Sequence, residues 1–548
     1  MARTQTAHPT AIFLNARIVT LDPQSPTAEA MAVCGERILA LGSREEILSL
    51  AAPHAAIIDL EGQVVLPGFN DSHMHLLSWG FTMDGVELQE ARSIQELIQL
   101  GLKYVQNNPG RKWILGRGFN DESFSTPGLP TRNDLDQIST GQPLVFTRVC
   151  GHICTANSRA LELAGIGAAT PDPPGGRIDR DPATGEPTGV LRENAIELVT
   201  KLIPSPTVAD LKRILRGASS AAAALGLTTV QSNDLHGAHS LTKRLQAYQE
   251  LDAAGELPIR IILQATMPTL EDLQAYLDVL SRTPQGSKLS LGPLKLYADG
   301  SLGGRTAALT CPYSDAPETD GMLIHNQEEL NELVLAAAQH NLQVAVHAIG
   351  DRAVDLVLNS YACALERFHN WNKRPRIIHA QITRYDQLIR MAQLGVVADI
   401  QPIFVPTDLH FAERRIGARR AEYAYAWKTM NRLGISTAGG SDSPVEPCNP
   451  LWGMHAAITR QDQTGYPQGG WHPQECLSGP EALTLFTAGS AYAAHEENLK
   501  GTLSPGKLAD FVVLPEDPTQ VEAEALLNLK VTASYVGGSK VSPESIPN

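Results

Sequence analysis

Two histidines one residue apart, His73 and His75, follow the apolar run 64–67 in the segment GFNDSHMHL. In a β-strand, residues i and i+2 point to the same side, so both imidazoles would converge above the C-terminal end of that strand. Neutral imidazoles are good ligands for zinc and similar divalent ions. The same pair can instead be two solvent-facing polar side chains, and the rest of the chain has to distinguish these two interpretations.

Eight apolar or β-branched runs, separated by helical patterns, would have to position such residues. They are residues 64–71, 226–232, 257–266, 291–300, 342–350, 376–382, 395–402 and 434–442. Strands that alternate with helices in this way predict an α/β fold, a (β/α)8 TIM barrel. The active sites of such barrels are built from the C-terminal ends of the strands, so polar residues at those ends are the candidates for chemistry.

Five of the eight predicted strands end in a residue that fits metal chemistry. These residues are His73, His75, Lys295, His347, His379 and Asp442. Asp442 would add a hard anionic oxygen to the imidazoles. Agreement among five strands favours a metal centre over the solvent-facing pair. Asp442 would also accept the proton of an attacking water and return it to a leaving nitrogen.

Lys295 is the exception in this set, because an ammonium group cannot bind a cation. One interpretation is an ordinary barrel lysine paired with an acidic neighbour such as Asp299. The other is a lysine carboxylated by CO2, whose new carboxylate can bridge two metal ions. Bridged metals lower the pKa of their shared water to about 7 and polarise a substrate carbonyl.

Two parts of the chain do not fit a minimal barrel. Residues 77–205 form an insertion with strands and a helix of its own, and its Pro/Gly-rich stretch 169–189 predicts an exposed hairpin or lid. We expect the insertion to cover the barrel mouth and to set substrate choice. The terminal segments 1–66 and 487–548 are rich in short strands and are expected to pair into one small composite β-sandwich, which leaves 67–486 for the barrel.

Six motifs taken together resemble the amidohydrolase superfamily. They are PGFNDSHMH, KLYADGSLGGRTA, VHAIGDRA, HAQ, GGSDSPV and GTLSPGKLADFVVL. The chain is most similar to the YtcJ-like branch, which includes N-substituted formamide deformylases, over about residues 10–540. The resemblance implies a metal-dependent hydrolase, commonly with zinc, built from a barrel and a composite β-sandwich.

The resemblance also implies roles for individual residues. The implied metal ligands are His73, His75, His347, His379 and Asp442, the last also as proton shuttle. Lys295 is implied as a carboxylated bridge, with one or two metals per chain. The resemblance implies an acidic residue directly before His379, but this chain has Ile378 there. The departure does not affect the ligand, His379, itself.

Three further residues are candidates for substrate binding, each with a structural alternative. His152 in the insertion can polarise a substrate oxygen or make a structural hydrogen bond. Arg305, in the glycine-rich loop after the fourth strand, can clamp a carboxylate or hold that loop. Gln401 ends the seventh strand and is expected to line the pocket.

The composition narrows the classes of partner. Lys plus Arg total 44 against 59 Asp plus Glu, and the net charge of -15 disfavours nucleic acid and anionic membranes. We find no apolar run of about 18 residues and no signal peptide at the N-terminus. The seven cysteines are scattered without zinc-ribbon spacing, which is typical of reduced thiols in a cytoplasm.

These observations predict a cytoplasmic enzyme that hydrolyses a C–N bond in a small amide, N-formyl compound or related molecule. A homodimer is a possible assembly. A metal-dependent isomerase or lyase on the same barrel is the first alternative, and product analysis separates it because only hydrolysis consumes water. The second alternative is a non-catalytic metal-binding regulator, which would have no need of a proton shuttle at Asp442.

Overall fold

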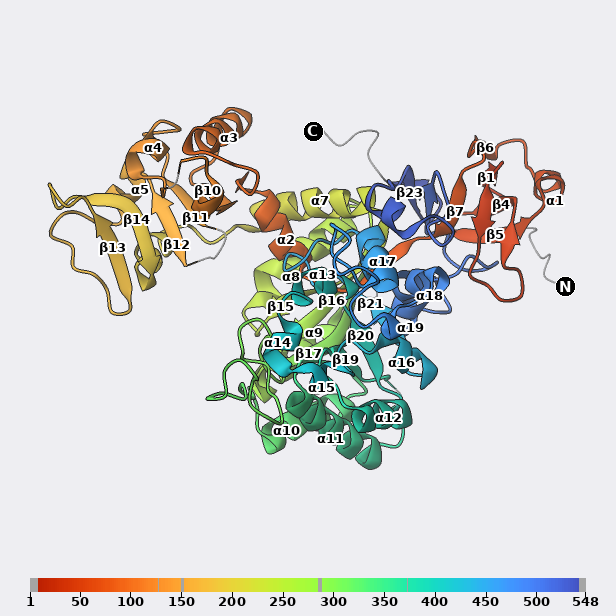
Figure 1. Cartoon of the computed structure of the whole chain (residues 1–548). Helices are drawn as coiled ribbons and strands as arrows, with labels where there is room; N and C mark the ends of the chain where they lie inside the picture. The colour runs from red at the N-terminus through yellow and green to blue at the C-terminus, as the bar shows by residue number, and fades with distance from the viewer. Residues whose placement is uncertain (1–7, 127, 149–151, 284–287, 372, 542–548) are drawn as a thin grey trace. The chain divides into compact units, whose positions relative to one another are not determined.

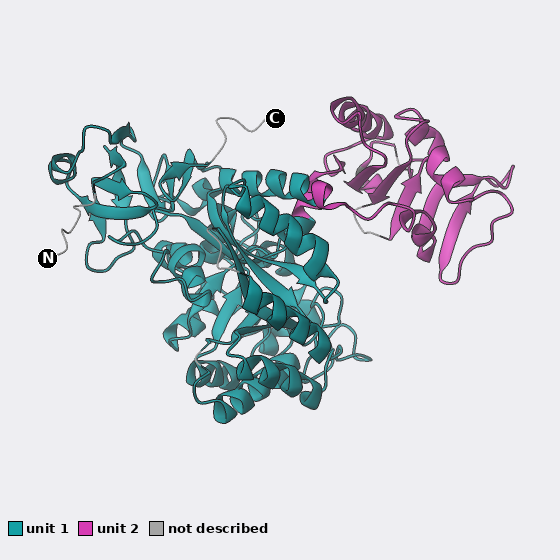
Figure 2. Ribbon diagram, turned by 180° about the vertical axis from the view of Figure 1, so that it is seen from behind, with its two compact units in different colours: residues 1–78, 211–548 teal, residues 79–210 magenta. Residues whose placement is uncertain are grey.

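The computed structural model describes residues 8–541 except 127, 149–151, 284–287 and 372. It divides into two compact units (Figure 2). Residues 1–78 and 211–548 form the first unit, and residues 79–210 form the second. The first unit holds the barrel and the terminal strands, and the second corresponds to the insertion. Among the residues described, no helix has the length and apolar character needed to cross a membrane.

Eight parallel strands form the barrel sheet of the first unit. In spatial order they are β8 (Phe69–Met74), β15 (Leu227–His236), β16 (Arg260–Thr266), β17 (Leu289–Tyr297), β18 (Val344–Ala348), β19 (Arg376–His379), β20 (Val397–Ile400) and β21 (Thr437–Gly439). Each strand pairs with its neighbour in the parallel sense. The predicted barrel is therefore confirmed.

Helices cover the outside of these strands (Figure 1). They include α7 (Val208–Ala224), α8 (Ser240–Ala253), α9 (Leu270–Arg282), α10 (Gln327–Gln339), α11 (Asp351–Arg367), α12 (Tyr385–Leu394), α16 (Trp427–Arg432) and α17 (Pro450–Thr459). The strands read as continuous apolar runs because their outer faces are covered by helices and their inner faces fill the barrel.

The first and last barrel strands are joined just beyond their C-terminal ends. The N–H of Asp442 donates to the carbonyl of His73 at 2.7 Å, and the N–H of His75 donates to the carbonyl of Ser443 at 2.8 Å. The buried carboxylate of Asp71 accepts from the backbone N–H of Ser441 at 3.2 Å and from its hydroxyl at 2.6 Å. These bonds fix the residues after β21 against β8.

The described parts of the two terminal segments form two sheets that share a core, as predicted. One sheet has the order β5 (Arg37–Gly42), β4 (Ala30–Cys34), β1 (Ala11–Leu14), β6 (Ala56–Asp59). The other has the order β24 (Ser539–Lys540), β23 (Ala533–Val536), β22 (Phe511–Leu514), β7 (Val64–Pro67), β2 (Arg17–Val19), β3 (Thr27–Ala28). Phe13, Phe511 and Tyr535 pack at ring-centroid distances of 4.5–5.2 Å in the core. Strands from opposite ends of the sequence thus share one core.

The apolar run 64–71 is two strands rather than the single strand expected. β7 pairs with β22 in the sandwich, and β8 begins at Phe69 in the barrel. Gly68 lies between them, and a Cβ there would overlap the side chain of Thr228. At the other end of the barrel, helix α19 (Ser490–Ala493) still packs on β21, a few residues past the expected boundary at 487.

The second unit is a six-stranded sheet with helices. The order is β13 (Gly176–Arg180), β14 (Pro187–Glu193), β12 (Ile153–Ala156), β11 (Leu144–Arg148), β10 (Ile114–Phe119), β9 (Val86–Glu87). Its helices include α3 (Ile94–Asn107), α4 (Arg132–Asp136) and α5 (Ser158–Leu163). The Pro/Gly-rich stretch forms the antiparallel hairpin β13–β14, which confirms that part of the prediction. The unit has apolar clusters of its own.

The six cysteines that the structure describes are free thiols. The seventh, Cys150, lies outside the described residues. Burial raises the pKa of the Cys154 thiol to about 12, so this group is unreactive.

Candidate metal centre

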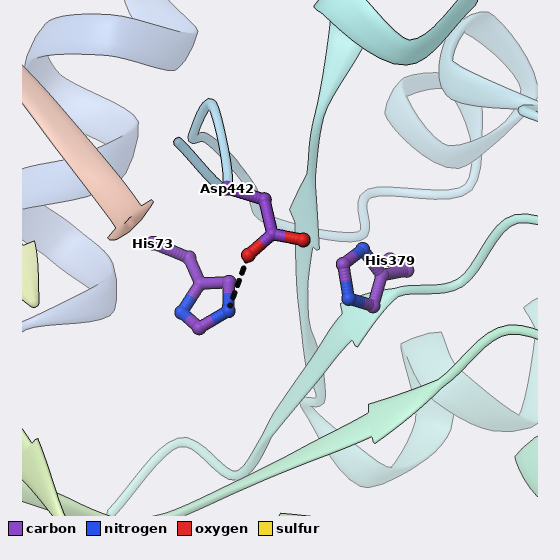
Figure 3. Close-up of side chains that lie close together, drawn as sticks. All are labelled: His73, His379 and Asp442. Carbon is purple, nitrogen blue, oxygen red and sulfur yellow. Dashed lines mark ion pairs between the residues drawn. The ribbon is translucent and has the colours of Figure 1, made fainter. Parts of the chain in front are cut away.

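Three buried side chains from three strand ends form the centre of the site (Figure 3). His73 belongs to β8, His379 ends β19, and Asp442 follows β21. One potential ligand atom from each lies within 4.8 Å of the other two. Asp442 Oδ1 lies 3.3 Å from His73 Nε2 and 3.1 Å from Nε2 of His75. The His-x-His pair is therefore turned inward and is not solvent-facing.

His347 on β18 completes the ring of imidazoles. Its ring centroid lies 4.5 Å from that of His379, and the His379 ring lies 6.1 Å from the ring of His73. The structure thus brings all four predicted histidines and Asp442 together at the C-terminal ends of the barrel strands.

Two of these imidazoles are oriented by backbone carbonyls. His75 Nδ1 donates to the carbonyl of Asn233 at 3.0 Å, and His347 Nε2 donates to the carbonyl of Gly300 at 3.0 Å. A carbonyl oxygen can only accept, so the bonded nitrogen carries the proton. The opposite nitrogen, Nε2 of His75 and Nδ1 of His347, keeps its lone pair as a potential metal ligand.

Burial sets the charge of the imidazoles. Desolvation lowers the pKa of His73, and it lowers that of His379 well below its usual value, which favours the neutral form that binds metals. Burial also opposes charge on His75, but the hydrogen bond and charge of Asp442 outweigh it and raise the pKa. Burial works against ionisation of Asp442, yet the imidazoles of His73 and His75 beside it hold its pKa well below the usual value.

Lys295 on β17 is fully buried in the same region. Its Nζ lies 3.8 Å from the centroid of the Tyr297 ring and donates to the Leu296 carbonyl at 3.5 Å. Burial lowers the pKa of the amine to about 7. Within the described part of the chain Lys295 forms no ion pair, which does not support the alternative interpretation of a lysine paired with Asp299.

Asp299 has other partners, which explains why it does not pair with Lys295. Its carboxylate accepts the backbone N–H groups of Ile349 at 3.0 Å, Gly350 at 2.8 Å and Ala308 at 2.9 Å. Asp299 Oδ1 also lies 3.4 Å from His347 Nε2. The residue therefore holds the loop after β18 beside the imidazole.

Two of the clustered residues have left-handed backbone conformations. The φ angles are 79° at His379 and 57° at Asp442. For a non-glycine residue such a conformation costs about 1–3 kcal/mol and persists only where the surroundings enforce it. The enforcing bonds are Asp442 N–H to the His73 carbonyl and, next to His379, Ala380 N–H to the Ala348 carbonyl at 3.0 Å.

The donor set fits a divalent cation. It offers imidazole nitrogens and one carboxylate gathered at one point. In His75 and His347 the second ring nitrogen is already bonded to a backbone carbonyl. Imidazole with carboxylate is a usual ligand set for zinc and related ions.

The three weaker candidates have different surroundings. Gln401 accepts a hydrogen bond from His379 Nδ1 at 2.7 Å, so it supports that imidazole and does not simply line a pocket. Arg305 is paired with Asp315 through Nη2 at 2.9 Å and Nε at 3.2 Å, which favours the loop-holding interpretation. His152 lies in the second unit with its Nδ1 2.9 Å from Glu193 Oε2.

Two residues of the site escaped the sequence prediction. His236 ends β15, its ring is stacked on that of His75 at 6.4 Å, and its Nε2 lies 3.1 Å from the Asn233 carbonyl. It was missed because the second strand was expected to end at residue 232. Gln264 lies within β16 and accepts from His73 Nδ1 at 2.9 Å. The sequence feature that could have identified Gln264 is its position as a polar residue inside the otherwise apolar strand IILQAT.

Comparisons with known proteins agree with this geometry. The profile of the amidohydrolase family matches residues 56–541. The putative amidohydrolase YtcJ of Bacillus subtilis (strain 168) is 35% identical, over 98% of this chain and 100% of that protein. The N-substituted formamide deformylase of Arthrobacter pascens is 29% identical, over 96% and 97%. A crystal structure of an uncharacterized metal-dependent hydrolase from Pyrococcus furiosus has a TM-score of 0.76 and 32% identity, covering 93% of this chain and 100% of that one.

Proposed function

This chain belongs to the amidohydrolase family, and from that premise we propose that it hydrolyses a C–N bond in an amide, an N-formyl compound or a related small molecule. The observation that carries the proposal is the gathering of four imidazoles and Asp442 at the C-terminal ends of the barrel strands. The likeness to a formamide deformylase favours a small amide-type substrate.

The metal ligands in this proposal are His73, His75, His347, His379 and Asp442. They would hold one or two divalent ions per chain, zinc being the first choice for this donor set. A divalent metal bound there would lower the pKa of a water molecule to about 7 and polarise the substrate carbonyl. Lys295 would join them as a carboxylated bridge. Its burial and the absence of an ion pair to it among the described residues support this role, because an ammonium would be repelled by the ions.

Asp442 is the proposed proton shuttle. Its pKa is held well below the usual value, so the carboxylate is ionised and can accept a proton from the attacking water. The same group then returns that proton to the leaving nitrogen, which departs as a neutral amine. In this proposal the histidines act only as ligands, each through a ring nitrogen that carries no proton.

Substrate choice is assigned to the insertion and to the loops after the strands. In this proposal residues 77–205 set substrate preference, with His152 as the candidate contact, and Arg305 acts through the loop that its pairing with Asp315 holds. The enzyme would work in the cytoplasm, and a homodimer is a possible assembly.

The test combines metal analysis with a substrate panel. Purified protein would be analysed for bound metal and then assayed against formamides, N-acyl amino acids and aryl amides, before and after chelation. Release of an amine and a carboxylic acid, with one water consumed, supports the proposal. An isomerised or eliminated product would instead support the alternative isomerase or lyase. Full turnover in protein that elemental analysis shows to be metal-free would disprove the metal mechanism.

A further inference from the structure

Two buried glutamines have the same arrangement beside two of the central histidines. Gln264 on β16 lies against His73, with Oε1 2.9 Å from Nδ1. Gln401, just after β20, lies against His379, with Oε1 2.7 Å from Nδ1. Gln264 has no exposed surface and Gln401 is 3% exposed. Water therefore cannot easily replace either amide.

A backbone carbonyl sets which way each amide faces. Gln264 Nε2 donates to the carbonyl of Ser72 at 3.0 Å, and Gln401 Nε2 donates to the carbonyl of Asp399 at 3.0 Å. Because a carbonyl only accepts, the NH2 end of the amide must face it. The oxygen end is then forced toward the imidazole.

The amide oxygen in turn determines the tautomer of the histidine. An oxygen that only accepts requires a proton on the facing nitrogen, Nδ1. The lone pair then lies on Nε2, which in His73 is the nitrogen that faces Asp442 at 3.3 Å. A reversed tautomer would direct an N–H group at the position of a metal ion.

We propose that Gln264 and Gln401 are positioning residues that fix the Nδ1–H tautomer of His73 and His379 and so prepare Nε2 of each ring for a metal ion. The inference rests on the proposed metal centre. Neither glutamine touches the ion or the substrate, and both act through the imidazoles. Both are uncharged, so the ligands are oriented without adding a negative charge to the centre.

The test compares leucine substitutions with a matched control. Gln264→Leu and Gln401→Leu remove the acceptor while keeping most of the volume. Gln387 on α12 is the control, because it is also buried but bonds no imidazole. Its Oε1 accepts from the N–H of Arg384 at 3.0 Å, and its Nε2 donates to the carbonyl of Asp351 at 2.6 Å. Gln387→Leu loses equivalent hydrogen bonds away from the centre.

Two measurements are made on each variant. The first is zinc affinity by competition with a chromogenic chelator. We expect it to fall about 10- to 100-fold in each site variant, the usual effect of losing a partner of a metal-bound histidine, and to stay unchanged in the control. The second is the 15N spectrum of the histidine side chains in metal-free protein. His379 is the reporter, because Asp442 faces Nε2 of His73 and influences its proton directly. We expect His379 to carry its proton on Nδ1 in the wild type and to lose that preference in Gln401→Leu.

A conservative substitution provides rescue. Gln264→Glu and Gln401→Glu keep an oxygen facing Nδ1, whether the carboxyl group is ionised or protonated. They should retain the tautomer and most of the zinc affinity.

The outcomes separate this inference from the proposed function. Wild-type protein that binds no metal would contradict the proposed function. The 15N spectrum of the metal-free protein would still show whether the glutamines set the histidine tautomer. Leucine variants with wild-type tautomers and wild-type zinc affinity would overturn the inference. An equal loss of affinity in Gln387→Leu would overturn it as well, because the effect would then be general destabilisation.

Discussion

Asp442 and His73 are linked twice, through the 2.7 Å backbone bond from Asp442 N–H to the His73 carbonyl and through the 3.3 Å approach of Asp442 Oδ1 to His73 Nε2. The first link joins the end of the barrel sheet to its beginning, and the second gathers the side chains of the centre. The site therefore depends on closure of the barrel at this point.

Replacing a central histidine should remove metal and activity together. We expect His73→Ala or His379→Ala to lose bound metal in elemental analysis and to melt at a lower temperature when metal is supplied, because a ligand that binds the native state stabilises it. His340→Ala, an exposed histidine at the end of α10, is the control and should keep both properties. Unchanged metal content in the two site variants would exclude these residues as ligands.

Asp442→Asn should separate metal binding from turnover. The amide keeps one oxygen but cannot accept the proton, so kcat should fall about 10²–10⁴-fold, the range for loss of a general base. Metal content should remain near that of the wild type. Near-normal kcat in this variant would remove Asp442 from proton transfer.

Lys295→Ala should lose activity and one or both metals. A carboxylated lysine supplies an anionic bridge, and a small carboxylate such as formate or acetate should partly restore activity by occupying its place. Metal counts and assays with added formate measure both effects. One metal per chain in fully active wild-type protein, with an unmodified amine at Lys295 in electron density, would contradict the bridge.

Reactivation of metal-free, decarboxylated protein should depend on pH. Only the neutral amine reacts with CO2, and burial lowers the pKa of Lys295 to about 7. The neutral fraction therefore increases as the pH rises through about 7, and the rate of reactivation by bicarbonate and zinc should rise over the same range. The rate would be followed at several pH values at constant dissolved CO2. A rate that decreased from pH 6 to pH 8 would contradict carboxylation of this amine.

Changes in the insertion should alter substrate preference more than metal content. His152→Ala, or exchange of residues 172–185 in the β13–β14 hairpin for those of a relative, should change the ratios of kcat/KM across an amide panel. Elemental analysis should show unchanged metal. Identical ratios before and after the exchange would exclude a role in specificity.

The order of apolar runs and polar strand ends was enough to predict the barrel, the paired termini and the residues that gather at the centre. These features depend on local periodicity and on the rule that parallel strands present their C-terminal ends on one side. His73, His347, His379 and Asp442 could therefore be named before any distance was known.

The hydrogen bonds and ion pairs between side chains of neighbouring strands were decided by the tertiary structure alone. The sequence suggested Asp299 as a partner of Lys295, but the folded chain bonds Asp299 to backbone N–H groups and leaves the amine buried against Tyr297. It likewise brings Gln264 to His73 across 191 residues. A spacing pattern indicates which strand end a residue occupies. Which side chain or carbonyl it bonds depends on the packing of neighbouring strands, because hydrogen-bond partners in the buried interior come from residues that are distant in sequence.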